Sequence, residues 1–386
     1  MDITIHPGKL TGTVTAIPSK SQAHRLLICA AFADDPTYLV CPDTNQDIEA
    51  TANCLRALGA EIQRTDDGYA VHTAKNIPQT AQIHCQESGS TLRFLLPIVG
   101  ALGVTTTIHT EGRLPQRPLS PLWEEMERMG CSLSRPTKNT ILCQGKLRSG
   151  TYNIAGNVSS QFITGLLLAF PLMEEPGAMN IIGKLESAPY VDMTRDVLAM
   201  FPNHQTPGTI TVEGDWSNGA FFLASQALGN NVAVENLSLN SKQGDRAAAS
   251  WLPALKDHCT ISAADIPDLV PILSVVAAAN QGAVFTDIQR LRLKESDRVA
   301  SVIAMLEALG GKAEATEDTL TVYGTGLTGG SVSSCNDHRI AMSAAIAATV
   351  CSEDVTILGA ECVSKSYPKF FEEYRRLGGN YEQYLR

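Results

Sequence analysis

Two kinds of hydrophobic pattern alternate along the chain. Short segments rich in Thr, Val and Ile, bounded by Gly, predict β-strands. Longer apolar runs, such as 26–33 and 269–279, follow polar turns and predict buried helices. The clearest predicted strands are 105–110, 151–154, 208–212, 231–234, 283–286, 319–323 and 354–358. Because strands and helices alternate throughout, the pattern predicts an α/β fold.

One helix ending recurs along the chain. The glycines that follow these helix ends are Gly59, Gly130, Gly310 and Gly378. Glycine suits this position because the residue after the last helical turn often needs a positive φ. Two further helix ends, at 197–201 and 252–256, lack the glycine and are followed by little chain. The pattern therefore predicts six repeats, with the third and fourth shortened.

Composition restricts the class of protein. With 386 residues, 44% hydrophobic and 18% charged, the chain has the profile of a soluble globular protein of about two domains. Its net charge of −10 disfavours general binding to nucleic acid or anionic membranes. The ten cysteines are scattered without metal-binding spacing, the N-terminus lacks a signal peptide pattern, and the apolar runs are too short for a bilayer. We expect a cytoplasmic protein without a metal site.

The segment 18–25 predicts a helix that begins at an anion-binding turn. Ser19 or Ser21 can cap the first turn, where free N–H groups and the helix dipole favour negative charge, and Lys20 adds an ammonium. Ser21 and Arg25 lie four residues apart and so share one helix face. Phosphate is a natural ligand for such a turn. For one such segment alone, a capped helix with a solvated basic end is the commoner explanation.

Five more predicted helix starts carry small polar residues and usually a cation. They are 87–93, 157–161, 294–298, 336–339 and 364–368. Each alone is explained by ordinary capping. Cations at a helix N-terminus oppose the dipole, however, so six such starts in one acidic chain predict a ligand with more than one phosphate or carboxylate.

Two acids stand apart from these cations. Asp268 precedes an apolar run, and Glu295 lies between basic residues. Both are candidate proton carriers, and both also have a structural explanation, Asp268 as a helix cap and Glu295 as an ion-pair partner. The chain lacks the glycine-rich phosphate loop and the nucleophile elbow, and no G-x-G-x-x-G motif links a strand to a helix, which disfavours nucleoside triphosphate and nicotinamide chemistry.

Taken together, the motifs resemble the EPSP synthase (3-phosphoshikimate 1-carboxyvinyltransferase) family over essentially the whole chain. The segments that carry the resemblance are 18–21 with Arg25, 88–93, 116–119, 159–161, 187–190, 267–268, 294–298, 336–339 and Lys365. The resemblance implies a two-domain inside-out α/β barrel built from six βαβαββ-type repeats. One lobe would comprise 1–16 plus 214–386 and the other 17–213, three repeats each, with the site in the cleft between them.

The resemblance also implies a reaction. The enolpyruvyl group of phosphoenolpyruvate would pass to the 5-hydroxyl of shikimate 3-phosphate, releasing phosphate, on the route to chorismate and aromatic amino acids. No cofactor and no metal are implied. The expected partners are the two small substrates, without nucleic acid or membrane, and the expected state is a monomer.

Site residues follow from the resemblance position by position. Three residues would carry the proton transfers, namely Lys20, Asp268 and Glu295. Shikimate 3-phosphate would contact Lys20, Ser21, Arg25, Ser159, Ser160, Gln161, Ser187, Tyr190, Asp268 and Lys294. Phosphoenolpyruvate would contact Lys20, Gly89, Arg117, Gln161, Arg298, Arg339 and Lys365.

Three positions depart from the family pattern, and two rival functions remain open. Glu87 adds a carboxylate beside Gly89, Arg290 replaces a smaller polar residue, and Trp216 replaces a small one at the second crossover. UDP-N-acetylglucosamine enolpyruvyl transferase would share the fold, but the loop 113–121 lacks the cysteine expected of it. The other rival is a non-catalytic protein that binds shikimate 3-phosphate.

Overall fold

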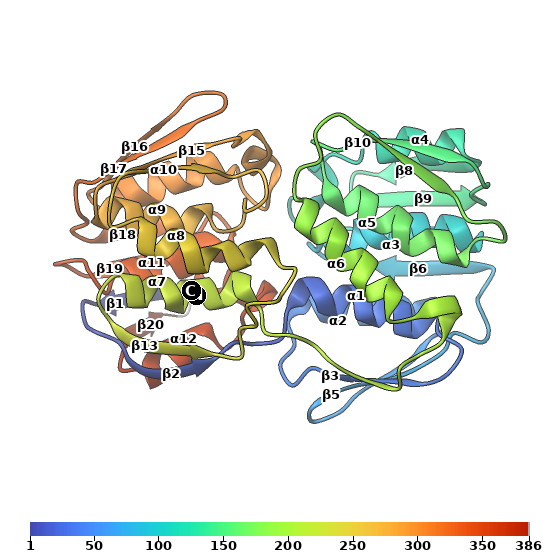
Figure 1. Ribbon diagram of the computed structural model, residues 1–386, viewed down its shortest axis with the longest axis horizontal. Helices are drawn as coiled ribbons and strands as arrows, with labels where there is room; N and C mark the ends of the chain where they lie inside the picture. Colours follow the sequence, from blue (N-terminus) through green and yellow to red (C-terminus); the bar gives the residue numbers. More distant parts are fainter. Residues whose placement is uncertain (385–386) are drawn as a thin grey trace. The chain divides into compact units, whose positions relative to one another are not determined.

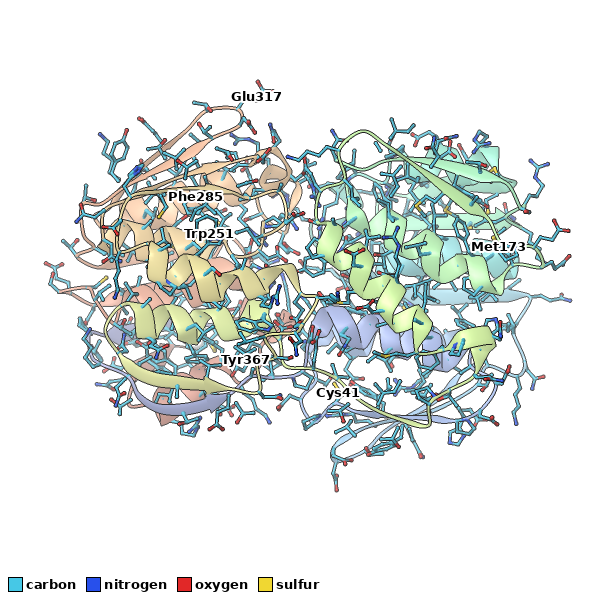
Figure 2. All side chains as sticks on the ribbon, in the orientation of Figure 1. Cys41, Met173, Trp251, Phe285, Glu317 and Tyr367 are labelled. Atoms are coloured by element: carbon cyan, nitrogen blue, oxygen red, sulfur yellow. The ribbon has the colours of Figure 1, made fainter. Side chains whose placement is uncertain are left out.

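The computed structural model describes residues 1–384. The chain divides into two compact units, coloured along the sequence in Figure 1. Unit 1 comprises Met1–Ile17 and Gly214–Arg386, and unit 2 comprises Pro18–Glu213. Each unit has its own hydrophobic core, and Figure 2 labels Phe285 in the core of unit 1.

Unit 2 contains two full repeats and one short one. The first has α1 (Lys20–Ala31), β3 (Thr37–Val40), α2 (Gln46–Ala57), β4 (Glu61–Arg64), β5 (Gly68–His72) and, from later in the chain, β12 (Thr209–Thr211). The second has β6 (Thr80–His84), α3 (Gly89–Leu102), β7 (Thr105–His109), η1 (Leu114–Gln116), α4 (Leu122–Arg128), β8 (Cys131–Thr137) and β9 (Thr140–Gly145). The third has β10 (Thr151–Ala155), α5 (Ser160–Ala169), η2 (Phe170–Leu172), β11 (Ala178–Ile182), α6 (Ala188–Ala199) and η3 (Pro202–His204).

Unit 1 follows the same plan with the short repeat first. The fourth repeat has β2 (Thr11–Thr15), α7 (Trp216–Ala227), β13 (Asn231–Glu235), η4 (Gly244–Ala247) and α8 (Ala248–Ala254). The fifth has β14 (Cys259–Ser262), α9 (Val270–Ala279), β15 (Ala283–Thr286), η5 (Gln289–Leu293), α10 (Arg298–Ala308), β16 (Lys312–Ala315) and β17 (Leu320–Tyr323). The sixth has β18 (Gly330–Ser333), α11 (His338–Ala347), β19 (Val355–Leu358), η6 (Ala360–Lys365), α12 (Phe370–Arg376), β20 (Asn380–Tyr384) and the N-terminal β1 (Asp2–His6).

The sheets show the repeat directly. Each full repeat forms a four-stranded sheet in which a parallel pair is extended by two antiparallel strands, as in β6-β7-β9-β8. The third and fourth repeats keep only the parallel pairs, β10-β11 and β2-β13. The prediction of an α/β fold of six repeats, with the third and fourth shortened, is confirmed.

The predicted local signals are confirmed as well. Positive φ angles occur at all four glycines that follow a helix end, Gly59 at 102°, Gly130 at 111°, Gly310 at 81° and Gly378 at 97°. Each of the seven predicted strands is present within one or two residues of its predicted bounds. One helix start is wrong: α12 begins at Phe370, whereas Lys365 ends the 3₁₀ turn η6.

The first helices of the repeats pack together inside each unit, as Figure 1 shows for α3 and α5 in unit 2. Nearly all residues of α3, α5, α9 and α11 are buried. Because these helices are equivalent elements of a repeat, each begins at an equivalent place, after the first strand of its repeat. The polar segments singled out in the sequence lie at these and the neighbouring helix starts.

Candidate active site

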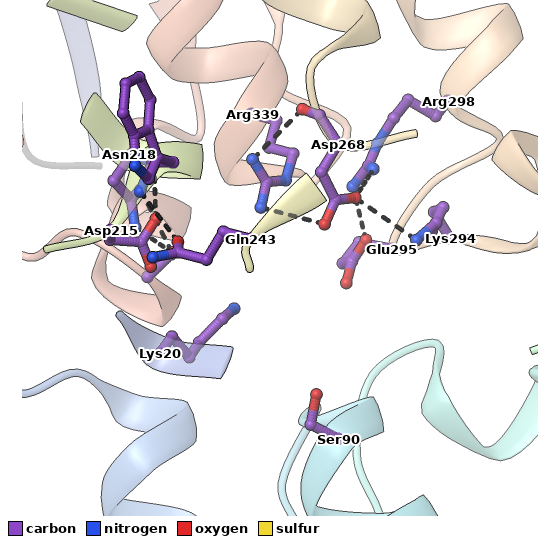
Figure 3. A network of polar contacts seen from close by, with 12 residues as sticks. Lys20, Ser90, Asp215, Asn218, Gln243, Asp268, Lys294, Glu295, Arg298 and Arg339 are labelled. Carbon is purple, nitrogen blue, oxygen red and sulfur yellow. Dashed lines mark hydrogen bonds and ion pairs between the residues drawn. The ribbon is translucent and has the colours of Figure 1, made fainter. Parts of the chain in front are cut away.

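In unit 1, three cations surround the carboxylate of Asp268 (Figure 3). One oxygen lies 2.6 Å from Nη1 of Arg298 and 3.4 Å from Nζ of Lys294, and the other lies 3.3 Å from Nη2 of Arg339. These residues come from the starts of α9, α10 and α11, so three separate segments form one group. The Asp268 side chain is still 26% exposed, so a ligand can reach it.

Arg298 is the buried residue that joins the carboxylates of this group. Its side chain has no exposed surface, and its guanidinium also donates to Oε2 of Glu295 at 2.6 Å and to Oδ2 of Asp337 at 3.0 Å. The Ser296 hydroxyl donates to the same Asp337 oxygen at 3.1 Å. Because Arg298 binds three carboxylates at once, it fixes the spacing between Asp268 and Glu295.

The charges of this group shift its pKa values in opposing directions. Burial alone would raise the pKa of Asp268, but Arg339, Lys294 and Arg298 outweigh it and hold that pKa well below the usual range. Burial lowers the pKa of Lys294 to about 8, although Asp268 partly offsets this effect. In the free protein Asp268 is therefore ionised, and the pKa of Lys294 is lowered to about 8.

Arg339 lies in the first turn of α11, and Lys365, the last residue of η6, contacts the turn that precedes this helix. Nζ of Lys365 donates to the Asn336 carbonyl oxygen at 3.0 Å, and the side chain of Asp337 caps the helix by accepting from the Arg339 N–H at 3.0 Å. Lys365 and Arg339 are 9% and 4% exposed. Two nearly buried cations thus flank a helix N-terminus, which favours an anionic ligand there.

In unit 2, the start of α1 carries an ion pair. Ser19 is the N-cap and accepts from the Gln22 N–H at 3.4 Å. Nζ of Lys20 lies 3.0 Å from Oδ2 of Asp47, which belongs to the first turn of α2. Both side chains are largely buried, at 15% and 17% exposure. The pair therefore holds the Lys20 ammonium at a defined place.

At the start of α3, two guanidinium groups converge on Gly89. A Cβ added to Gly89 would lie 2.8 Å from Nη1 of Arg117 and 2.9 Å from Nη1 of Arg93. Arg93 Nη1 also donates to Oε1 of Gln161 at 2.7 Å, and Gln161 Nε2 donates to the Ser90 hydroxyl at 2.9 Å. The absent side chain, the two cations and the helix N-terminus together form a setting that suits an oxyanion.

Arg25 is a buried cation whose hydrogen-bond partners in the described chain are all neutral. It donates to the Thr194 hydroxyl at 2.8 Å, the Thr164 hydroxyl at 3.2 Å and the Tyr190 carbonyl oxygen at 3.0 Å. Burial lowers its pKa to about 10. A buried charge without an opposite charge is costly, so the site favours an anionic ligand beside Arg25.

Comparison with known proteins agrees with this geometry. The family model described as EPSP synthase (3-phosphoshikimate 1-carboxyvinyltransferase) matches residues 5–260 and 251–374. The chain belongs to the EPSP synthase family. Curated 3-phosphoshikimate 1-carboxyvinyltransferases of Clostridium kluyveri and Clostridium acetobutylicum are 36% and 37% identical to it, each over 99% of this chain and 98% of the relative. The predicted family and the predicted class of enzyme, a transferase, are confirmed.

Solved structures show the same fold. EPSP synthase from Acinetobacter baumannii matches with a TM-score of 0.80 at 23% identity, covering 99% of this chain and 100% of that chain. The enolpyruvyl transferase NikO from Streptomyces tendae matches with a TM-score of 0.73 at 16% identity, covering 99% and 98%. At these identities the two matches show the two-domain α/β fold and nothing finer.

The predicted site residues of this EPSP synthase family member fall into a few local groups. In unit 1 one group holds Asp268, Lys294, Glu295, Arg298 and Arg339, with Lys365 at the start of α11. In unit 2 the groups are Lys20 with Asp47, Gly89 with Arg117 and Gln161, and Arg25 with Ser21 and Tyr190. The remaining predicted residues begin helices, Ser159 and Ser160 at α5 and Ser187 at α6. For all of these residues, the contacts with substrates stay a prediction.

The sequence analysis missed four polar contributors. Asp47 pairs with Lys20, Arg93 reaches Gly89, and Thr164 and Thr194 hold Arg25. Only Arg93 carried a visible signal, since it is the cation of the segment 88–93, which was predicted to begin a helix. The other three became apparent only through contacts with residues far away in the sequence.

Two of the departures from the family pattern, Trp216 and Arg290, make local polar contacts. Trp216 begins α7; its backbone N–H donates to Gln243 at 2.9 Å, and its indole N–H donates to the Ser238 carbonyl oxygen at 2.9 Å. Figure 3 shows Gln243 beside Asp215, the N-cap of α7. Nη1 of Arg290 lies 3.5 Å from the Ala264 carbonyl oxygen. Two hydrogen bonds thus hold the buried Trp216 at the crossover.

Within residues 1–384, no group of three or more His, Cys, Asp or Glu side chains is arranged to hold a metal ion. No helix in that same part of the chain has the length and hydrophobicity needed to cross a membrane.

Proposed function

We propose that this chain transfers the enolpyruvyl group of phosphoenolpyruvate to the 5-hydroxyl of shikimate 3-phosphate and releases inorganic phosphate. The observation that carries the proposal is the group around Asp268, where two carboxylates lie among three cations. Such a group can bind anions and move protons at the same place. The full-length similarity to named 3-phosphoshikimate 1-carboxyvinyltransferases supports the same reaction.

Substrate binding rests on the buried cations. In unit 2, Arg25 is a proposed contact for shikimate 3-phosphate. The other proposed contacts in this unit at α5 and α6 are Ser159, Ser160, Gln161, Ser187 and Tyr190. The α3 start with Gly89 and Arg117, and the α11 start with Arg339 and Lys365, are the proposed contacts for phosphoenolpyruvate. Anions there would neutralise cations that burial makes costly, which is the source of affinity.

The proton transfers are assigned to Lys20, Asp268 and Glu295. In the addition step, a proton goes to the methylene carbon of phosphoenolpyruvate, and the 5-hydroxyl loses its proton as its oxygen bonds to the adjacent carbon. In the elimination step, the new methyl group loses a proton and the carbon–oxygen bond to phosphate breaks. Asp268 is the proposed base for the hydroxyl, and Glu295, with Lys20, the proposed group at the methylene carbon.

The low pKa of Asp268 in the free protein is compatible with a base that substrates activate. A carboxylate held ionised by Arg339, Lys294 and Arg298 is a weak base. When anionic substrates neutralise those cations, the pKa of Asp268 rises toward the range in which it can accept a proton. The base would then become effective only once the substrates are bound.

A phosphate-release assay tests the proposal. We expect release from phosphoenolpyruvate only when shikimate 3-phosphate is present, and none with UDP-N-acetylglucosamine as acceptor. Asp268→Asn and Glu295→Gln should each lower the single-turnover rate at least about 100-fold, the range of general acid–base catalysis. Release with the nucleotide sugar would favour the rival transferase, whereas binding of shikimate 3-phosphate without release would favour a non-catalytic protein.

The proposal extends to the setting of the reaction. We expect a cytoplasmic monomer that works with these two substrates, without a cofactor and without nucleic acid. The absence of a membrane-spanning helix among residues 1–384 is compatible with that setting.

A further inference from the structure

A buried chain of polar side chains links three helices of unit 2. Nδ1 of His24 lies 2.7 Å from Oγ1 of Thr51, which lies 2.7 Å from Oγ1 of Thr91. Thr91 Oγ1 in turn lies 2.8 Å from Oγ of Ser88. All four residues are at most 1% exposed. They come from α1, α2 and the start of α3.

This hydrogen-bond chain lies about one helical turn after the helix starts that carry the proposed substrate contacts. His24 follows Lys20 by four residues, Thr51 follows Asp47 by four, and Thr91 follows the N-cap Ser88 by three. Residues at these spacings share a helix face. The Lys20–Asp47 ion pair therefore joins α1 to α2 at the ends of the helices, and the His24 chain joins the same helices, with α3, one turn further in.

Geometry determines the direction of the hydrogens along the chain. Thr91 has one hydroxyl hydrogen, which it donates to Ser88 Oγ at 2.8 Å, with the Asp47 carbonyl oxygen a second acceptor at 3.4 Å. Because Thr91 uses this hydrogen for Ser88, it can only accept in the 2.7 Å contact with Thr51, so Thr51 donates to Thr91. Thr51 then has no hydrogen left for His24, so the imidazole must donate from Nδ1 to Thr51.

The surroundings of the ring agree with this tautomer. Nε2 of His24 is buried and has no hydrogen-bond partner among residues 1–384. An N–H there would be an unsatisfied buried donor, whereas a bare nitrogen is the less costly state. The ring centroid of Phe94 lies 6.2 Å from that of His24, in an edge-on arrangement, and 5.0 Å from Cζ of Arg25. The Phe94 ring therefore keeps water away from both side chains.

We propose that His24 is a positioning residue: as a neutral Nδ1–H donor it begins the chain that holds the first turns of α1, α2 and α3 in register. It thereby fixes Lys20 relative to Gly89. The role in phosphoenolpyruvate binding rests on the proposed function. Arg25, by contrast, is anchored by Thr164 and Thr194 from α5 and α6, so this contact with shikimate 3-phosphate does not depend on the hydrogen-bond chain.

Removing one hydroxyl tests the inference. Thr51→Val keeps the shape of the side chain but removes the hydroxyl that links His24 to Thr91 in the buried hydrogen-bond chain. We expect the KM for phosphoenolpyruvate to rise at least about tenfold and kcat to fall less than about threefold, because a misplaced contact weakens binding of one substrate. The dissociation constant of shikimate 3-phosphate should stay within about twofold, and Thr51→Ser should restore the wild-type KM.

The matched control is Thr349→Val in unit 1. Thr349 is also buried, and its hydroxyl bonds to Asn230 at 3.0 Å and to the Ile346 carbonyl oxygen at 2.8 Å. This variant should lose stability to a similar extent but keep the KM for phosphoenolpyruvate. If both variants change KM equally, or if Thr51→Val weakens both substrates alike, the chain is merely structural and the inference is wrong.

His24 itself provides a test by amide replacement. The amide N–H of Asn reaches the place of Nδ1, whereas that of Gln reaches the place of Nε2. We therefore expect His24→Asn to retain the wild-type KM for phosphoenolpyruvate and His24→Gln to raise it about tenfold or more. The reverse order would overturn the inference.

The state of the ring can be measured without any variant. Nitrogen-15 NMR of the wild-type protein should show His24 as the neutral Nδ1–H tautomer at pH 7, and an Nε2–H tautomer or an imidazolium would contradict the inference. This measurement, and direct titration with phosphoenolpyruvate, need no turnover. A wild-type protein that binds phosphoenolpyruvate but releases no phosphate would overturn the proposed function. The NMR measurement and the titration of the His24 variants with phosphoenolpyruvate would still test the inference.

Discussion

At Gly89 a missing side chain leaves room for two cations. We expect Gly89→Ala to push a methyl group against Nη1 of Arg117 and of Arg93, which lie 2.8 and 2.9 Å from the Cβ position. Because the first turn of α3 can shift little, the guanidinium groups must move. The KM for phosphoenolpyruvate should rise about tenfold, equivalent to about 1.4 kcal/mol, with little change for shikimate 3-phosphate.

Gly8→Ala is the control for this prediction. The added Cβ would lie 4.0 Å from the nearest neighbouring atom, the His6 carbonyl oxygen, so it meets no steric conflict. Steady-state kinetics of the two variants should differ only for Gly89→Ala. An unchanged KM in both would mean that Gly89 does not face the phosphoenolpyruvate contacts.

From the lowered pKa of Lys294 we expect substrate binding to depend on pH. Burial lowers its pKa to about 8, so in the free protein it is charged below that pH and loses its proton above it. An anionic substrate favours the charged form, so the dissociation constant of shikimate 3-phosphate should be flat below pH 8 and rise about tenfold per pH unit above it. Isothermal titration between pH 6.5 and 9.5 would measure this change.

The replacement Lys294→Arg serves as the control, because a guanidinium stays charged over the whole range. Its affinity profile should lose the inflection near pH 8. Stability is expected to move in the other direction: between about 8 and the usual value of 10.5 the unfolded chain binds more protons at Lys294, so this group adds to the free energy of unfolding as the pH rises. A binding profile that is flat up to pH 9.5 would contradict the role of this residue.

At the scale of elements, the start of α10 couples stability to the site. Asp297 caps this helix by accepting from the Ala300 N–H at 3.2 Å, and the next residue is Arg298. We expect Asp297→Ala to lower the free energy of unfolding by about 1 kcal/mol. The rate of phosphate release should fall as well, because a frayed first turn loosens the guanidinium that spaces Asp268 from Glu295. Urea unfolding together with the release assay measures both effects.

Asp297→Asn separates capping from charge. Asparagine accepts the same hydrogen bond, so both stability and activity should be close to wild type. Asp297 also lies 3.8 Å from Arg292 at the surface, and an exposed ion pair of this kind contributes little. Equal losses in the Asn and Ala variants would show that the charge, rather than the cap, matters.

At the scale of the whole molecule, the two units differ in how the chain builds them. Unit 2 is one continuous segment whose ends are joined by the hydrogen bond from the Ser19 N–H to the Glu213 carbonyl oxygen at 2.7 Å, and it has its own core. We therefore expect residues 18–213 to fold alone. The fragment should give a dispersed amide NMR spectrum and a cooperative unfolding transition.

The fragment 214–386 is the matched comparison. It lacks β1, which lies between β19 and β20, and β2, which pairs with β13. Without β1 the sheet of the sixth repeat loses an inner strand and its neighbours lose their hydrogen-bond partners. We expect this fragment to remain unfolded, and to fold only when residues 1–17 are supplied. An ordered 214–386 alone would contradict this view of the fold.

Features that depend on neighbouring residues could be predicted from the sequence alone. Positive φ at Gly59 and its three counterparts, the alternating strands, and the capped helix starts follow from local sterics and hydrogen bonding. Because these signals recur at similar spacing, they predicted the six repeats and their two short members. The order of the motifs along the chain was enough to indicate the family.

Which polar groups come into contact could be learned only from the packing of the helices. Asp268, Arg298 and Arg339 come from three helix starts, and their distances depend on how α9, α10 and α11 pack. The same holds for the neutral partners of Arg25 and for the buried chain that begins at His24. Local pattern does not encode these contacts, because the energy of a charge depends on the burial and partners that distant segments provide.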